Sequence, residues 1–159
     1  MHSSAGRSNS RRSGSLAAIV TSPLENLATP GGPLKREAPD AEEYRGLVHS
    51  GPVRLNDARN TTNSLESRFD LAYNAAHALS LAALRRVGYR AEKRYVVFQV
   101  LPHTLGLGPD VWRVLDKCHT IRNRGEYEGD LDIEEGLVRD LIEACQRVLA
   151  SVEQLPGLR

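Results

Sequence analysis

Apolar side chains recur at alternating steps of three and four residues from about Leu55 to Arg86. The repeating positions are Leu55, Ala58, Thr62, Leu65, Phe69, Ala72, Ala76, Leu79 and Ala83. This spacing places them on one face of a helix, and at 1.5 Å per residue that helix would be about 50 Å long. Other apolar residues between these positions widen the stripe. The pattern predicts one long, alanine-rich core helix that packs on more than one side, with Gly88 as its C-terminal cap.

A shorter helix is predicted just before this stretch. Asp40 suits the N-cap position, and Glu43 three residues later completes a capping-box pattern. The apolar side of this helix comprises Ala41, Tyr44, Leu47 and Val48. The pair Gly51-Pro52 is expected to end it.

The next clear helical signal begins at Pro109-Asp110, where proline suits the first turn. Its apolar stripe comprises Val111, Val114 or Leu115, Cys118, and Ile121 or Arg122. The helix leads into the polar segment Lys117–Tyr127, and Gly125 is expected to break or distort its end.

A last amphipathic helix is predicted from the capping-box pair Asp132 and Glu135 to the stop at Pro156-Gly157. Its apolar face comprises Val138, Leu141, Ile142, Cys145, Val148, Leu149 and Val152.

The stretch Tyr95–Leu101 is apolar and rich in β-branched residues, a composition compatible with a strand or a buried helix. A lone strand cannot satisfy its backbone hydrogen bonds, and the neighbouring sequence suggests no second strand. We therefore predict a buried helix that ends before Pro102.

Residues 1–37 are rich in serine, arginine, proline and glycine. Such a segment buries too little apolar area to offset the entropy lost on ordering its backbone. We predict a disordered leader over residues 1–37 and one all-α domain, a four- to five-helix bundle, over residues 38–155.

Composition narrows the function classes. A net charge of +1 excludes a chain-wide electrostatic attraction to nucleic acid and leaves a local basic patch open. Cys118 and Cys145 occupy apolar helical positions, and neither a Cys-x-x-Cys pair nor a Cys/His cluster with ligand spacing occurs, so no metal or other cofactor is expected. No apolar run approaches the roughly 20 residues that span a bilayer. We expect a cytoplasmic protein with no membrane contact.

Polar residues form two edges on the predicted helices. His119, Arg122, Asn123 and Glu126 follow the spacing i, i+3, i+4, i+7, which places them on one helical face. A second edge, on the long helix, comprises Asp70, Asn74 and His77. For the second edge a solvated or pairing face is favoured over a metal or catalytic role.

The segment Arg122-Asn123-x-x-Glu126-Tyr127 carries the candidate chemistry. Arginine presents a planar, permanently charged fork that suits a phosphodiester, and a titratable neighbour can move the proton of a 2′-hydroxyl. Together with the helix order over about residues 40–152, this segment resembles the HEPN superfamily of small helical bundles, whose hallmark is an Arg-polar-x-x-x-His motif. Here Tyr127 stands at the histidine position, and tyrosine, with a pKa of about 10, is a poor base at neutral pH. The motif is therefore incomplete.

The resemblance implies a homodimer whose two motifs face each other across the interface. It also implies a metal-independent endoribonuclease leaving cyclic phosphate ends, or a member that only binds RNA or nucleotides. Many such proteins are toxins paired with a nucleotidyltransferase-like antitoxin partner. On this basis the expected catalytic residues are Arg122, Asn123, Tyr127 and His119. The expected contacts to RNA phosphates are Arg122, Arg124 and Glu126.

Two further interpretations remain open. An Asp116–His119 pair, one turn apart, would orient and charge the imidazole and so supply the missing base. Alternatively, Arg122 and Glu126 form a surface ion pair while Tyr127 packs in the core, and the chain is a non-catalytic bundle that binds a protein partner.

Overall fold

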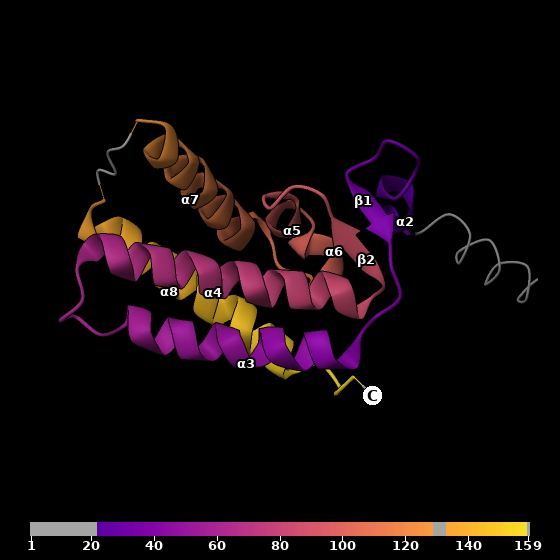
Figure 1. Ribbon diagram of the computed structural model, residues 1–159, viewed down its shortest axis with the longest axis horizontal. Helices are drawn as coiled ribbons and strands as arrows, with labels where there is room; N and C mark the ends of the chain where they lie inside the picture. The colour runs from indigo at the N-terminus through magenta and orange to yellow at the C-terminus, as the bar shows by residue number, and fades with distance from the viewer. Residues whose placement is uncertain (1–21, 129–132, 159) are drawn as a thin grey trace, which may run out of the picture.

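The computed structural model describes residues 22–128 and 133–158, and of residues 126–128 it describes the backbone alone. The elements, in chain order, are α2 (Pro23–Leu27), β1 (Leu34–Arg36), α3 (Ala41–Ala58), α4 (Leu65–Arg86), β2 (Tyr89–Ala91), α5 (Val96–Gln99), α6 (Leu101–Thr104), α7 (Pro109–Glu128) and α8 (Glu135–Glu153). In Figure 1, α3 and α4 run side by side, α7 lies on the other side of α4, and the small two-stranded ribbon lies at one end. The predicted all-α bundle is confirmed.

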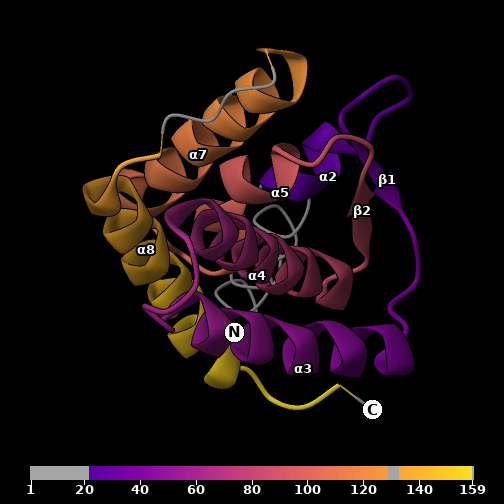
Figure 2. The ribbon, with the colours of Figure 1, turned by 60° about the vertical axis from the view of Figure 1, so that its left-hand side comes forward.

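Helix α4 is the centre of the bundle. It contacts α3, α5, α6, α7, α8 and β2, and Figure 2 shows these elements arranged around it. Its buried positions include Phe69, Ala72, Ala76 and Leu79, which are at most 1% exposed. The prediction of an alanine-rich helix packed on more than one side is confirmed for this part of the chain.

The single helix predicted from Leu55 to Arg86 is wrong, because the chain turns between α3 and α4. Leu55 and Ala58 end α3, and the turn follows at residues 59–64. The Asn60 side chain accepts hydrogen bonds from the Thr62 amide and hydroxyl, and the Ser64 hydroxyl caps α4 by accepting from the Ser67 amide. These short polar side chains offer the backbone an alternative to the helix, which apolar spacing does not register.

The predicted stop at Gly51-Pro52 is also wrong, since α3 continues through both residues. Gly51 is buried, and a Cβ placed there would lie 2.5 Å from Cγ of Leu79 in α4. The glycine therefore permits close packing of two helices rather than ending one. The start of α3 is as predicted at Asp40, whose carboxylate accepts from the amides of Glu42 and Glu43.

The leader prediction is wrong for residues 22–37, which contain α2 and β1. Strand β1 pairs antiparallel with β2, in the register Leu34 to Ala91 and Arg36 to Tyr89. Neither strand was predicted: β2 lies just before the stretch for which a strand was considered, and its partner β1 lies in the predicted leader. Residues 1–21 lie outside the described part of the chain.

Arg85, at the end of α4, fastens this segment to the bundle. Its side chain is 2% exposed and donates hydrogen bonds to the backbone carbonyls of Glu37 and Ala38 at 2.9 and 2.7 Å. It also donates to the Glu43 carboxylate at 2.7 Å. A buried guanidinium needs such partners to offset its desolvation, and here they come from three points along the preceding chain.

The chain after β2 is helical, as predicted, but divided. Val96–Gln99 form α5, and Pro102 lies in the first turn of α6, so proline begins a new turn here rather than following a helix end. The expected break at Gly125 is wrong, because α7 runs on to Glu128. The predicted cap Asp132 lies outside the described residues, and α8 begins after Glu134 with no side-chain cap.

Both cysteines belong to the core, as predicted. Cys118 and Cys145 are at most 1% exposed, and burial raises the pKa of each thiol to about 12. Across the described residues no group of three ligand-type side chains could hold a metal ion. Within the same residues no helix is both long and apolar enough to cross a bilayer.

Candidate functional site

The last third of α7 presents His119, Arg122 and Asn123 toward α4, where Tyr73 meets them. We call these four residues the α4–α7 cluster. The helical spacing predicted the shared face on α7, and the uninterrupted helix produces it. Tyr73 is 1% exposed, whereas the three α7 residues are partly exposed. The cluster therefore has a buried base and an accessible rim.

A hydrogen-bonded chain runs through the His119 ring. Its Nδ1 lies 2.7 Å from the Tyr73 hydroxyl, and its Nε2 lies 3.0 Å from Nδ2 of Asn123. An amide nitrogen only donates, so with Asn123 in this orientation Nε2 accepts. A neutral His119 then carries its proton on Nδ1 and donates it to the Tyr73 oxygen. The predicted Asp116–His119 pair is wrong, because both of these ring hydrogen bonds go to other residues.

Arg122 is fixed against α4. Its guanidinium carbon lies 4.9 Å from the centre of the Tyr73 ring, and its Nε lies 3.6 Å from a carboxylate oxygen of Asp70. The Arg122 side chain is 21% exposed. An arginine over an aromatic face is held by the ring quadrupole, and its planar fork matches the geometry of a phosphate.

A second guanidinium approaches the same ring. The guanidinium carbon of Arg94, in the segment before α5, lies 5.5 Å from the Tyr73 ring centre, and its Nη2 donates to Oδ1 of Asn74 at 3.1 Å. The polar edge predicted on α4 is thus a pairing face: its Asp70 and Asn74 hold the two arginines that lie against Tyr73.

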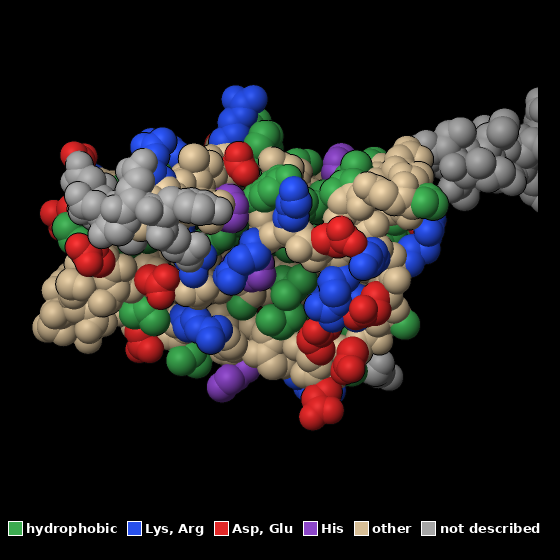
Figure 3. Space-filling model, turned by 45° about the horizontal axis from the view of Figure 1, so that its top comes forward, with side chains coloured by type: hydrophobic (Ala, Val, Ile, Leu, Met, Phe, Trp, Pro, Cys, Tyr) green, Lys and Arg blue, Asp and Glu red, His purple; other side chains and the backbone are tan. Residues whose placement is uncertain are grey.

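His77, the third member of that edge, reports the local electrostatics. Its ring packs edge-on against Phe98, with 6.1 Å between ring centres. Burial, followed by the positive charges of Arg94, Arg122 and His119, lowers the pKa of His77 to about 4. Burial is the larger cause, and the nearby positive charges add to it in disfavouring a further cation at this position. Figure 3 shows histidine and Lys/Arg side chains together in the middle of this face.

Three of the predicted site residues are not part of the α4–α7 cluster. They are Arg124, Glu126 and Tyr127. The backbone at Glu126 and Tyr127 lies in the last turns of α7, and their side chains are not among those described, so the Arg122–Glu126 pair and a core position for Tyr127 stay predictions. Arg124 is exposed and lies about 200° around α7 from Arg122. The two arginines therefore do not share a face of α7, and a contact of Arg124 with RNA phosphate stays a prediction.

Sequence reasoning missed Tyr73, Arg94 and Tyr95. Tyr95 lies with its ring centre 5.6 Å from that of His119. In the sequence Tyr73 resembles an ordinary core residue. The neighbouring residues do not indicate that its hydroxyl contacts a histidine far along the chain. The available signal was its place between Asp70 and His77 on the polar edge of the same helix.

Comparison of the chain with protein-family models, with curated proteins and with solved structures found no match. The chemistry of the α4–α7 cluster therefore carries the functional proposal.

Proposed function

We propose that the chain is an RNA-directed helical module of the HEPN type, in which the α4–α7 cluster binds the phosphodiester backbone beside a histidine. The observation that supports this most directly is the placement of His119 between Tyr73 and Asn123, next to Arg122. The proposal includes the homodimer and the toxin–antitoxin or defence setting, with a nucleotidyltransferase-like partner, that the resemblance implies.

The contacts indicate the role that each residue of the cluster would have. Arg122 and Arg94 present guanidinium groups over one aromatic ring, and together they would bind a phosphate through charge-assisted hydrogen bonds. Asn123 holds the His119 ring, and in the neutral ring Nε2 carries the lone pair.

In cleavage, the Asn123 amide would have to turn away from Nε2. The freed lone pair would then take the proton of a ribose 2′-hydroxyl as its oxygen attacks the adjacent phosphorus. The 5′-oxygen leaves with a proton from solvent or from a second acid, and a 2′,3′-cyclic phosphate remains. His119 would thus supply the base that Tyr127 cannot supply at neutral pH.

One observation favours the alternative of a non-catalytic interaction module. Arg122 already lies beside the Asp70 carboxylate, and an arginine paired in this way also suits a structural role at the α4–α7 contact. The two functions differ in what Arg122 does for RNA, so one experiment separates them.

The experiment incubates labelled single-stranded RNA with the wild type, Arg122→Ala and His119→Gln, and measures binding and cleavage. A lost charge-assisted contact costs about 1.5–3 kcal/mol, so Arg122→Ala should weaken binding about tenfold or more. His119→Gln should abolish cleavage with a smaller effect on binding. Arg45→Ala, which removes an exposed arginine on α3, is the matched control and should change neither.

Equal binding and cleavage by the wild type and Arg122→Ala would rule out this site. Binding without cleavage in the wild type would leave the RNA-binding form of the proposal and remove the nuclease. Thermal melts of each variant establish that the comparison is between folded proteins.

A further inference from the structure

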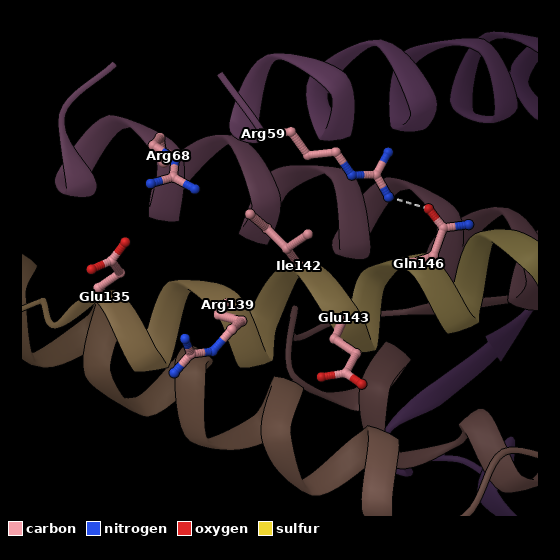
Figure 4. Close-up of a pocket in the computed structure, with 7 residues that line it drawn as sticks. All are labelled: Arg59, Arg68, Glu135, Arg139, Ile142, Glu143 and Gln146. Carbon is pink, nitrogen blue, oxygen red and sulfur yellow. Dashed lines mark hydrogen bonds between the residues drawn. The ribbon is translucent and has the colours of Figure 1, made fainter. Parts of the chain in front are cut away.

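A pocket of about 460 Å³ lies away from the α4–α7 cluster, where the end of α3 and the start of α4 meet α8. Figure 4 shows three arginines around it: Arg59 after α3, Arg68 on α4 and Arg139 on α8. Arg68 lies about 140° around α4 from Tyr73 at 100° per residue. The pocket therefore opens on a different side of the central helix and shares no residue with the proposed RNA site.

Two of these guanidinium groups are oriented by the protein. Arg68 donates through Nε to the Ala58 carbonyl at 2.8 Å, and Arg59 donates to the side-chain oxygen of Gln146. Each bond uses one N–H group of a five-donor fork. The bonds hold Arg68 at the end of α3 and Arg59 against α8, and they leave donors for a ligand.

Arg139 is different, because within residues 22–128 and 133–158 it has no hydrogen-bond or ion-pair partner. Its Nη2 lies 3.6 Å from where a Cβ on Gly136 would be, so the guanidinium folds back along α8 over bare backbone. An arginine at a pocket wall without a protein acceptor is the member of the set best able to bind an anion.

The remaining lining residues indicate what the anion is attached to. Ile142 supplies an apolar surface among the lining residues, Glu135 lies at the Arg68 end of the pocket, and the Glu143 carboxylate points away from Ile142 (Figure 4). Carboxylates repel a bare polyanion but accept hydrogen bonds from hydroxyl and amino groups. We infer that this pocket binds a nucleoside phosphate, with the phosphates on the arginines, the sugar hydroxyls on the glutamates and the base against Ile142. The pocket volume falls within the range of about 300–1,000 Å³ typical of small-molecule sites.

Isothermal titration of the full chain with ATP, GTP and inorganic phosphate tests the inference. At least one nucleotide should bind, more tightly than inorganic phosphate, and Arg139→Ala should weaken that binding about tenfold or more. Arg147→Ala is the matched control, since it removes an exposed arginine two turns further along α8 and outside this pocket. Nucleotide affinity should be unchanged in this control.

Failure of both nucleotides to bind at millimolar concentration would overturn the inference. Equal affinity in the wild type and Arg139→Ala would do the same, as would loss of binding in Arg122→Ala alone, which would move the ligand to the α4–α7 cluster. A nucleotide site that survives Arg122→Ala stands whether or not that cluster binds RNA. Because Arg139 is exposed and makes no described bond, its replacement should leave the melting temperature unchanged.

Discussion

Replacing His77 by glutamine should make the protein less sensitive to acid. The folded structure lowers the pKa of His77 from 6.5 to about 4, chiefly through burial and then through Arg94, Arg122 and His119. The unfolded chain therefore binds a proton on this residue at a pH where the folded chain does not. His77 leaves the free energy of unfolding unchanged above pH 6.5. Below that value it lowers this free energy progressively, and the decrease is complete near pH 4.

The size of the effect follows from the pKa difference. One unit of pKa corresponds to about 1.4 kcal/mol, so the fall from 6.5 to about 4 corresponds to about 3 kcal/mol when the histidine is fully protonated. At pH 5 the loss should be roughly 2 kcal/mol. That is a large share of the stability of a small domain, which is about 5–15 kcal/mol.

Urea denaturation at pH 7 and pH 5 measures this contribution. Carboxylates also titrate in this range, so the informative quantity is the difference between the wild type and His77→Gln at each pH. The wild type should lose roughly 2 kcal/mol more than the variant between the two values. His49→Gln, at an exposed position on α3, should titrate like the wild type. Parallel pH profiles for the wild type and His77→Gln would refute the lowered pKa of His77 and with it the burial and positive charges assigned to its surroundings.

Two further predictions concern the fold. Gly51→Ala should destabilise the protein by about 1–3 kcal/mol, because the new Cβ would meet the Leu79 side chain at 2.5 Å. Gly46→Ala on the same helix meets nothing within 4 Å and should stabilise by about 0.5–1 kcal/mol. A Gly51→Ala variant that is as stable as Gly46→Ala in urea denaturation would contradict the packing role of Gly51. Arg85→Met should cost about 3–5 kcal/mol, because it removes the donor of the Glu37, Ala38 and Tyr89 carbonyls and leaves Glu43 with Arg90 as its remaining arginine partner. In a thermal melt an unchanged midpoint for Arg85→Met would show that the guanidinium does not fasten the β1 segment.

Much of the helical content could be predicted because helix faces are local. The apolar positions of α4 and α8 repeat with the helical period, and nearly all of them are buried. The wrong predictions arose where a residue type that is typical of a helix end has another role in the folded protein. Gly51 and Pro52 resemble a stop, and only the contact with Leu79 shows that Gly51 serves packing inside a continuing helix. Likewise β1 could not be recognised alone, because a strand exists only with the partner that completes its hydrogen bonds.

For the site, the sequence alone determined which α7 residues share a face, since that depends on helical spacing over a few residues. It also indicated a separate polar edge on α4. Only the tertiary structure brought the two edges together: the bond from Tyr73 to His119 joins residues 46 positions apart. Side-chain pairing across that separation depends on how α4 and α7 pack, and packing reflects the whole core rather than any local pattern.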